Sequence, residues 1–357
     1  MRRYIIRRLI QAIPTFLGIT ILSYALMTAS GNPVRTLSFR PGRTPDDMER
    51  LAARLGVNDP WPVQYVRWLL GDDWMRRDTD GDGIADTAII IELDADGDGE
   101  PDPPGTRRGV LRGDFGNSFV AGRPVIDILT ERFPATLELS IAGITLGALI
   151  GIAIGIIAAV TRGGMFDNVS RVIAVAFDAI PSFWLSIMLL LIFSVQLNIF
   201  PIGDRCGFTL EPSCPPIYQR LEYMVLPVFV FATGFIAAYS RIMRASMLDI
   251  LNKDYILTAR AKGLTNRSIW FRHGARNAMI PIATFLGPAI TSLLAGAVII
   301  ERIFNYPGVG STALNAALQR DFPVVMATTI YAGLATIIGY LISDMLYAAI
   351  DPRIRFE

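Results

Sequence analysis

Residues 254–264 read Asp254-Tyr-Ile-Leu-Thr-Ala-Arg-Ala-Lys-Gly-Leu264, and this polar stretch lies between two long apolar segments. Asp254 stands where it can cap a short helix over residues 255–262, because an Asp side chain accepts hydrogen bonds from the free N–H groups at a helix start. Gly263 can end that helix in a left-handed conformation, and Thr265 can cap a second short helix. The stretch therefore predicts a compact helix–turn–helix at a membrane surface.

The composition around this stretch is that of a membrane protein. Of the 357 residues, 52% are hydrophobic and 18% are charged, and the mean hydropathy is +0.42. A transmembrane helix needs about 20 largely apolar residues. We expect an all-α, multi-pass membrane protein with six transmembrane helices, at roughly residues 9–29, 136–160, 172–196, 223–245, 277–300 and 323–350.

Basic residues predict the orientation of these helices. Arginines and lysines gather beside alternate ends of successive spans, most densely between the fourth and fifth spans. Basic loops stay in the cytoplasm, so we expect both termini there, in the plasma (inner) membrane of a prokaryote. The first apolar run is longer than the core of a cleaved signal peptide, so we expect it to remain as an anchor. Membrane lipid accounts for the basicity, and nucleic acid is not an expected partner.

Motifs along the chain carry a family resemblance. Gly113-Asp-Phe-Gly-Asn-Ser118 precedes the second span, Glu301-Arg-Ile-Phe-Asn-Tyr-Pro-Gly-Val-Gly310 follows the fifth, and Asp351-Pro-Arg-Ile-Arg355 lies at the end of the sequence. Together with residues 258–264 they resemble the permease subunits of ATP-binding-cassette (ABC) importers, most closely the oligopeptide and dipeptide branch. The matches run along the chain except at about residues 70–110. The resemblance implies the type I ABC importer permease fold and one half of a translocation pore for short peptides or similar solutes.

The resemblance also implies a partner surface. In that family a loop of this kind docks into a groove on the ATPase subunit, and here the loop corresponds to residues 250–276. The implied coupling residues are Tyr255, Thr258, Ala259, Arg260, Ala261, Lys262 and Gly263. Thr258 stands where other branches have an acidic residue, so no carboxylate role is expected there. The implied partners are a paralogous permease subunit, two ATP-binding subunits and an extracytoplasmic solute-binding protein.

We do not expect the chain to be an enzyme. It lacks the phosphate-binding sequence Gly-x-x-x-x-Gly-Lys-Ser/Thr, so ATP should be bound and hydrolysed by partner subunits. Its single histidine, His273, lies in the polar loop beside Arg272, where a docking role is expected rather than chemistry.

An acidic insertion at about residues 70–110 interrupts the external segment after the first span. Asp78-Thr-Asp-Gly-Asp82 and Asp94-Ala-Asp-Gly-Asp98 recur sixteen residues apart, each followed by glycine. Carboxylates at loop positions 1, 3 and 5 with glycine at position 6 suit a hard cation with oxygen ligands. The loops resemble those of EF-hand, dockerin and thrombospondin type 3 repeats, although neither has a glutamate at position 12. We expect structural Ca²⁺ held by Asp78, Asp80, Asp82 and Asp86, and by Asp94, Asp96, Asp98 and Asp102; a solvated acidic hairpin is the alternative.

The two cysteines, Cys206 and Cys214, both lie in the predicted external loop between the third and fourth spans. An oxidising compartment would allow a disulfide between them, and two free thiols in a reducing habitat are the alternative.

Small and charged residues inside the spans predict helix contacts. Glycines at four-residue intervals in the second span indicate close packing against another helix; they are Gly143, Gly147, Gly151 and Gly155. Asp178 and Asp344 lie about one turn inside their spans near the inner interface. We expect Arg241 or Arg244 to pair with them, because an unpaired intramembrane carboxylate is costly.

The predicted domains are the N-terminus and first span (1–30), an extracytoplasmic domain (31–135), a five-helix permease core with the coupling loop (136–350) and a cytoplasmic tail (351–357). Related permeases share one pore design, so a nickel chelate or an oligosaccharide remains an alternative cargo. A secondary transporter would need no docked ATPase. A calcium-dependent adhesion protein or receptor would explain the acidic loops but not six spans.

Overall fold

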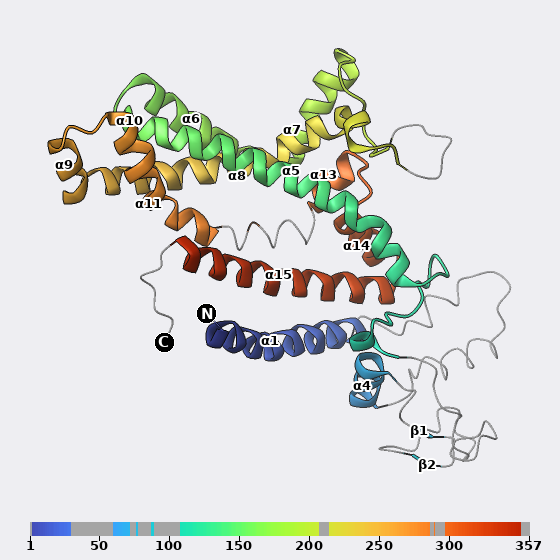
Figure 1. Ribbon diagram of the computed structural model, residues 1–357. Helices are drawn as coiled ribbons and strands as arrows, with labels where there is room; N and C mark the ends of the chain where they lie inside the picture. Colours follow the sequence, from blue (N-terminus) through green and yellow to red (C-terminus); the bar gives the residue numbers. More distant parts are fainter. Residues whose placement is uncertain are drawn as a thin grey trace. The chain divides into compact units, whose positions relative to one another are not determined.

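The computed structural model describes residues 2–29, 60–71, 76–77, 87–88, 108–206, 214–285, 289 and 297–350. The described chain is almost wholly helical (Figure 1), which confirms the predicted all-α class. Besides turns and loops, the described residues include two short antiparallel strands, β1 (Arg76–Arg77) and β2 (Thr87–Ala88).

Among the described residues, four helices are long and apolar enough to cross a bilayer. They are α1 (Arg2–Ala29), α5 (Val125–Val160), α8 (Leu221–Leu251) and α15 (Phe322–Ile350). They agree with the first, second, fourth and sixth predicted spans. The fifth predicted span, 277–300, lies partly outside the described residues.

The third predicted span is not one straight helix. Helix α6 (Met165–Ala179) ends before Ile180, and α7 (Ser182–Leu189) continues into the π-helical turn η2 (Leu190–Gln196). The two halves are bent by 98°. Pro181 explains the break, because proline disfavours helical backbone in the residue before it, and Ile180 is extended, at φ −78° and ψ 121°. The described chain thus has four spans, or up to five if the bent pair is one.

The remaining helices are short. They are α4 (Trp61–Leu70), η1 (Val110–Arg112), η3 (Ile217–Gln219), α9 (Asp254–Ala261), α10 (Asn266–Ser268), η4 (Ile269–Ala275), α11 (Arg276–Ala278), α13 (Val298–Ile303) and α14 (Val309–Leu318). Packing divides the chain into two compact units. The larger unit comprises residues 1–13, 132–312 and 331–357, and the smaller unit comprises residues 14–131 and 313–330.

Helix α8 is the central helix of the larger unit, packing against α6, α7, α11 and α13. The glycines of α5 lie against it so closely that a side chain would not fit. A Cβ atom on Gly151 would lie 2.9 Å from Tyr239 Cβ and 3.0 Å from the Ile236 carbonyl oxygen, and one on Gly155 would lie 2.7 Å from Met243 Cβ. The predicted close packing of this glycine row is therefore confirmed.

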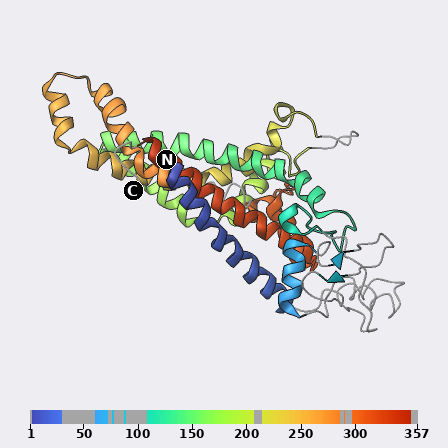
Figure 2. The same ribbon diagram turned by 60° about the horizontal axis from the view of Figure 1, so that its bottom comes forward.

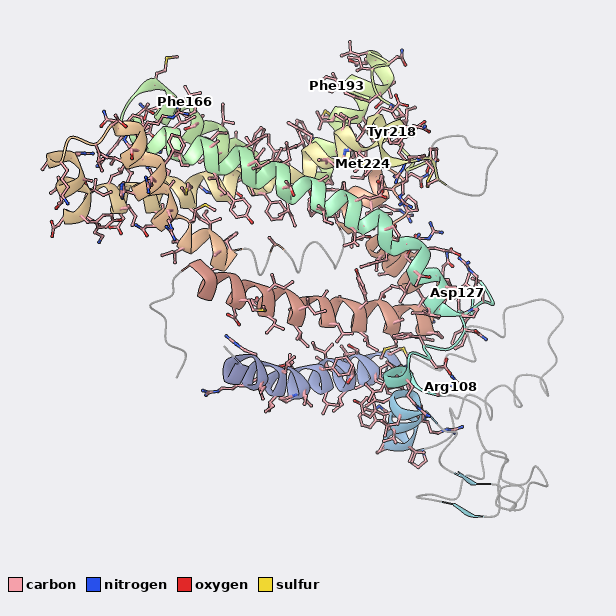
Figure 3. The ribbon with its side chains drawn as sticks, viewed as in Figure 1. Arg108, Asp127, Phe166, Phe193, Tyr218 and Met224 are labelled. Atoms are coloured by element: carbon pink, nitrogen blue, oxygen red, sulfur yellow. A yellow bond between two sulfur atoms is a disulfide. The ribbon has the colours of Figure 1, made fainter. Side chains whose placement is uncertain are left out.

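Two apolar clusters occupy opposite ends of the larger unit. One contains Met224, Phe304 and Tyr306, and the other contains Tyr239, Met243 and Met247. Figure 3 shows Phe193, Tyr218 and Met224 together where α7 lies, whereas Phe166 lies at the far end, near α10. The predicted coupling loop (250–276) and the loop that carries the two cysteines thus belong to different ends of this unit.

The smaller unit holds an anchored turn. Asp321 accepts hydrogen bonds from Ser118 Oγ at 2.5 Å and from the Phe119 backbone N–H at 3.0 Å. The Gly113–Ser118 motif and the Asp321-Phe322-Pro323 sequence, far apart in the chain, therefore meet at this carboxylate.

Candidate coupling segment and polar clusters

The polar stretch folds into two short helices separated by a glycine turn. Gly263 has φ +74°, and the Gly263 N–H donates to the Arg260 carbonyl at 3.0 Å, so the predicted left-handed helix end is confirmed. Thr265 Oγ1 accepts a hydrogen bond from the Ser268 N–H at 3.4 Å, which confirms the second cap. The first predicted cap is wrong. Lys253 is the extended residue before α9, and Asp254 is already helical, where its charge still complements the positive helix start.

One face of α9 is buried within the loop. Ile256 is fully buried and Ala259 is 8% exposed, and both pack against Ile269 of η4. Ala259 therefore faces inward and allows α9 to approach η4 closely. The other predicted coupling residues are exposed: Tyr255, Thr258, Arg260, Ala261, Lys262 and Gly263.

The segment is tied to α8. Gly274 of η4 packs closely on Met247 of α8. A Cβ atom on Gly274 would lie 3.2 Å from Met247 Cε. Asn277 Nδ2 donates to Tyr255 Oη at 3.1 Å. These contacts join η4 to α8 and α9 to α11. At α10 and η4 the surface has a hollow lined by Thr265, Arg267, Ser268, Phe271 and Arg272.

A buried ion pair lies at the start of α6. Asp167 is 1% exposed and accepts two hydrogen bonds from Arg244, at 2.5 Å and 2.8 Å, and one from the Gly163 N–H at 2.9 Å. This pair joins the α6 start to α8. Sequence reasoning missed it and expected Arg244 to meet Asp178 or Asp344.

The other intramembrane carboxylates have different partners. Asp178 pairs with Arg241 at 2.8 Å, as predicted. Asp344 pairs with Arg8 at 2.9 Å, so the expected pairing with Arg241 or Arg244 is wrong there. The sequence alone does not show which arginine pairs with which aspartate, because the pairing depends on which helices pack side by side.

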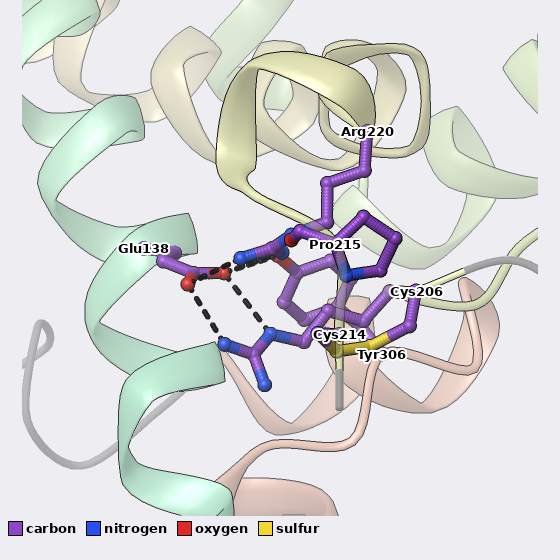
Figure 4. A network of polar contacts seen from close by, with 7 residues as sticks. Glu138, Cys206, Cys214, Pro215, Arg220 and Tyr306 are labelled. Carbon is purple, nitrogen blue, oxygen red and sulfur yellow. Dashed lines mark hydrogen bonds and ion pairs between the residues drawn. A yellow bond between two sulfur atoms is a disulfide. The ribbon is translucent and has the colours of Figure 1, made fainter. Parts of the chain in front are cut away.

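A second cluster centres on Glu138 of α5 (Figure 4). Arg205 donates to its carboxylate at 3.0 Å and 2.7 Å, and Arg220 donates at 2.8 Å and 2.7 Å. Tyr306 Oη donates to Glu138 Oε2 at 3.2 Å. Burial raises the pKa of Tyr306 to about 12, so its hydroxyl keeps its proton. Hydrogen bonding to Glu138 raises the pKa of Arg220. Three separate segments therefore converge on one carboxylate.

The two cysteines lie beside this cluster. Cys206 follows Arg205 directly, and the structure joins it to Cys214 with a Cα–Cα distance of 5.0 Å. On the far side of the loop, Arg220 Nε donates to the Pro215 carbonyl at 2.9 Å. The bond between Cys206 and Cys214 therefore links the backbone stretch that carries Arg205 to the stretch that carries Arg220.

A third cluster explains the Glu301–Gly310 motif. Glu301 is fully buried and accepts hydrogen bonds from Thr136 Oγ1 at 3.0 Å and from the Ser311 N–H at 2.7 Å. Its carboxylate fills the space that a Cβ on Gly308 would occupy, so only glycine fits there. Burial raises the pKa of Glu301, outweighing the opposing effect of its hydrogen bonds.

Comparison with known proteins identifies the family. Residues 151–356 match the model of the binding-protein-dependent transport system inner membrane component, and residues 1–87 match the model of the N-terminal part of such a component. The chain belongs to this family. AppB, an oligopeptide transport system permease protein of Bacillus subtilis (strain 168), is 36% identical over 357 residues, covering all of both chains. DppB, a dipeptide transport system permease protein of Escherichia coli (strain K12), is 33% identical over 376 residues, again covering all of both.

A solved structure gives a weaker match. A chain of the inward-facing MetNI methionine ABC transporter aligns with a TM-score of 0.49 at 18% identity, covering 63% of this chain and 97% of that one. Family membership and the apolar helices make this component an integral inner-membrane protein.

The structure of this inner membrane component describes some predicted site residues and not others. The coupling residues share one loop and the two cysteines are joined. The eight aspartates of the acidic insertion lie outside the described residues: Asp78, Asp80, Asp82, Asp86, Asp94, Asp96, Asp98 and Asp102. Sequence reasoning missed Glu138, although a single carboxylate within the apolar run 136–160 was a usable signal.

Proposed function

We propose that this chain forms one half of the translocation pore of an ATP-driven importer for short peptides. Full-length identity of 36% to an oligopeptide permease protein carries the proposal, together with 33% identity to a dipeptide permease protein. The described spans offer few unpaired charges to grip a solute, so selectivity would rest with an extracytoplasmic binding protein. A paralogous permease and two ATP-binding subunits would complete the assembly.

Uptake into proteoliposomes tests this function. The complex encoded with this chain should accumulate labelled di- and oligopeptides only when ATP and the binding protein are supplied. Uptake driven by an ion gradient without ATP would favour a secondary transporter. Uptake of a nickel chelate or an oligosaccharide in place of peptides would reassign the cargo.

We propose further that the exposed face of α9 docks on an ATP-binding subunit. Three observations support this. The face is polar and exposed, its opposite side is fixed through Ile256 and Ala259, and η4 packs on α8 through Gly274 and Met247. Closure of the ATPases would push α9, and the rigid contacts would move α8 with it, switching the pore between outward and inward states. Ala259 would act here as a spacer rather than as a contact.

Replacement of Gly263 tests the docking surface. No atom lies within 4 Å of a Cβ placed there, so Gly263→Val adds no clash and acts through its left-handed backbone, at a cost of about 1–2 kcal/mol. We expect loss of transport and of substrate-stimulated ATP hydrolysis. Gly263→Asn is the matched control, because asparagine tolerates this conformation and should retain coupling. If the valine variant transports at the parental rate, α9 is not the docking element.

The acidic insertion is proposed to bind structural Ca²⁺ through the two groups of four aspartates. So many converging carboxylates repel one another unless a cation neutralises them. Binding and local folding would then be one equilibrium, since the ligands come together only when the loops close. The ordered loops would shape the surface that receives the binding protein.

The remaining proposals concern topology. With both termini in the cytoplasm, Cys206 and Cys214 would face an oxidising compartment and form a disulfide there. Intact mass after alkylation of the folded, unreduced protein tests this, because two labelled thiols would exclude the bond.

A further inference from the structure

Helix α4 lies crosswise at one end of a membrane span. In both views it crosses the far end of α1, the end remote from the N-terminus (Figures 1 and 2). Residues 14–29 of α1 and all of α4 belong to the smaller unit. Because α1 runs through the bilayer, a helix lying across its end runs along the membrane plane.

Ring contacts fix α4 in this position. The Tyr24 ring of α1 lies 5.3 Å from the Trp68 ring, 5.7 Å from the Tyr65 ring and 6.3 Å from the Trp61 ring, measured between centroids. Thr20 Oγ1 and Tyr65 Oη are hydrogen-bonded at 2.9 Å. These α4 residues follow one another at helical spacing, so a single stripe of the helix faces α1.

The other end of α4 is held by contacts that residues 109–112 make with its backbone. Arg112 Nη2 donates to the Leu70 carbonyl at 2.6 Å. Gly109, at φ +78°, comes so close to Gly71 that a Cβ there would lie 2.9 Å from Gly71 Cα. Helix α4 is therefore a fixed part of the smaller unit.

Apolar side chains remain on the surface of this assembly. Trp61 is 39% exposed, Leu70 is 40% exposed, and Leu111 of η1 is 56% exposed. On α1, Thr20 and Tyr24 face α4, whereas Leu22 and Leu26 lie on the other side of the helix and are 61% and 64% exposed. In a transmembrane helix such exposed leucines are suited to lipid contact.

The depth of the aromatic group fits the membrane interface. Tyr24 lies five residues before the α1 end at Ala29, which is about 7.5 Å along a helix rising 1.5 Å per residue. The polar layer on each side of the hydrocarbon core is about 5–7 Å thick. Tryptophan and tyrosine concentrate in this layer, because their rings are apolar while their N–H and O–H groups reach water.

We infer that α4 is an interfacial helix whose partner is the lipid bilayer, at the boundary between headgroups and acyl chains. With Trp61, Tyr65 and Trp68 around Tyr24, it anchors the end of the first span and sets its depth. This role requires only that α1 spans the membrane, and it is independent of the transported solute.

Fluorescence quenching by brominated lipids tests the inference. The assembled transporter is placed in nanodiscs with a variant whose only tryptophan is Trp61, the other four being changed to phenylalanine. Bromine near the headgroup end of the acyl chain should lower Trp61 emission by about twofold or more, and bromine near the chain end should lower it less. A matched variant that retains only Trp270, in the polar loop, is the reference.

Two outcomes would overturn the inference. Trp61 emission that neither lipid quenches would place α4 away from the bilayer. Quenching of the isolated chain that disappears in the assembled transporter would mean that a protein partner covers α4. Photolabelling of the unaltered transporter with a diazirine phospholipid gives an independent result, because it should mark residues 61–70, and the absence of label there would contradict a lipid contact.

Discussion

Replacing Glu138 by glutamine should destabilise the larger unit strongly. The carboxylate accepts four charge-assisted N–H bonds, at 2.7–3.0 Å, from two arginines that have few other partners. The side chains of Arg205 and Arg220 are only 12% and 5% exposed. The glutamine amide would offer one acceptor oxygen and would turn its NH₂ group toward a guanidinium. Both arginines would then be left buried without their counter-charge.

The expected loss of stability follows from the burial of the ion pairs around Glu138. Removing one partner of a fully buried ion pair costs about 3–5 kcal/mol. Glu138 itself is 19% exposed, so water can reach part of the cluster and the lower end of that range applies. A loss of about 3 kcal/mol lowers the folding equilibrium constant about a hundredfold.

The free energy of unfolding can be measured by SDS titration in mixed micelles. Glu131→Gln is the matched control, because Glu131 also forms a two-bond pair, with Arg123, but their side chains are 51% and 42% exposed. That change should leave the unfolding midpoint close to the parental value. In a double-mutant cycle, Glu138→Gln combined with Arg220→Gln should cost less than the sum of the two single changes.

Two results would refute this reasoning. A Glu138→Gln variant as stable as Glu131→Gln would show that burial of the arginines carries no penalty. Additive losses in the cycle would show that Glu138 and Arg220 do not interact in the folded protein.

Further predictions concern α5, the Glu301 cluster and the acidic insertion. Gly151→Leu should separate α5 from α8 and lower stability by about 1–3 kcal/mol in the same titration, with Gly151→Ala losing less; equal stability of all three would exclude the close contact. Because burial raises the pKa of Glu301, the folded state holds its proton more tightly than the unfolded state, so stability should fall as pH rises above about 4.3. Glu301→Gln should remove that slope, and an unchanged pH profile would contradict the assignment. Proteolysis within residues 70–105 should be slowed by Ca²⁺ and restored by chelator, with Asp80→Ala plus Asp96→Ala abolishing the difference; equal cleavage with and without Ca²⁺ would leave the solvated acidic hairpin.

The sequence by itself determined the features that depend on local chemistry. Four of the spans follow from apolar runs, since a bilayer requires each helix to satisfy its own backbone and to be apolar around its surface. The left-handed end at Gly263 and the cap at Thr265 follow from the conformations those residues favour within a few positions. The glycine row of α5 predicted a close helix contact because its spacing matches one helix face.

Only the tertiary structure decided which distant residues meet. The partners of Glu138 lie 67, 82 and 168 residues away in the chain, and Arg244 meets Asp167 instead of the aspartates that sequence reasoning favoured. Several arginines were equally suitable by charge, and the choice among them depends on helix packing. The inward face of Ala259 and the crosswise position of α4 likewise depend on packing, because a side chain's neighbours across a fold are set by geometry that no local pattern encodes.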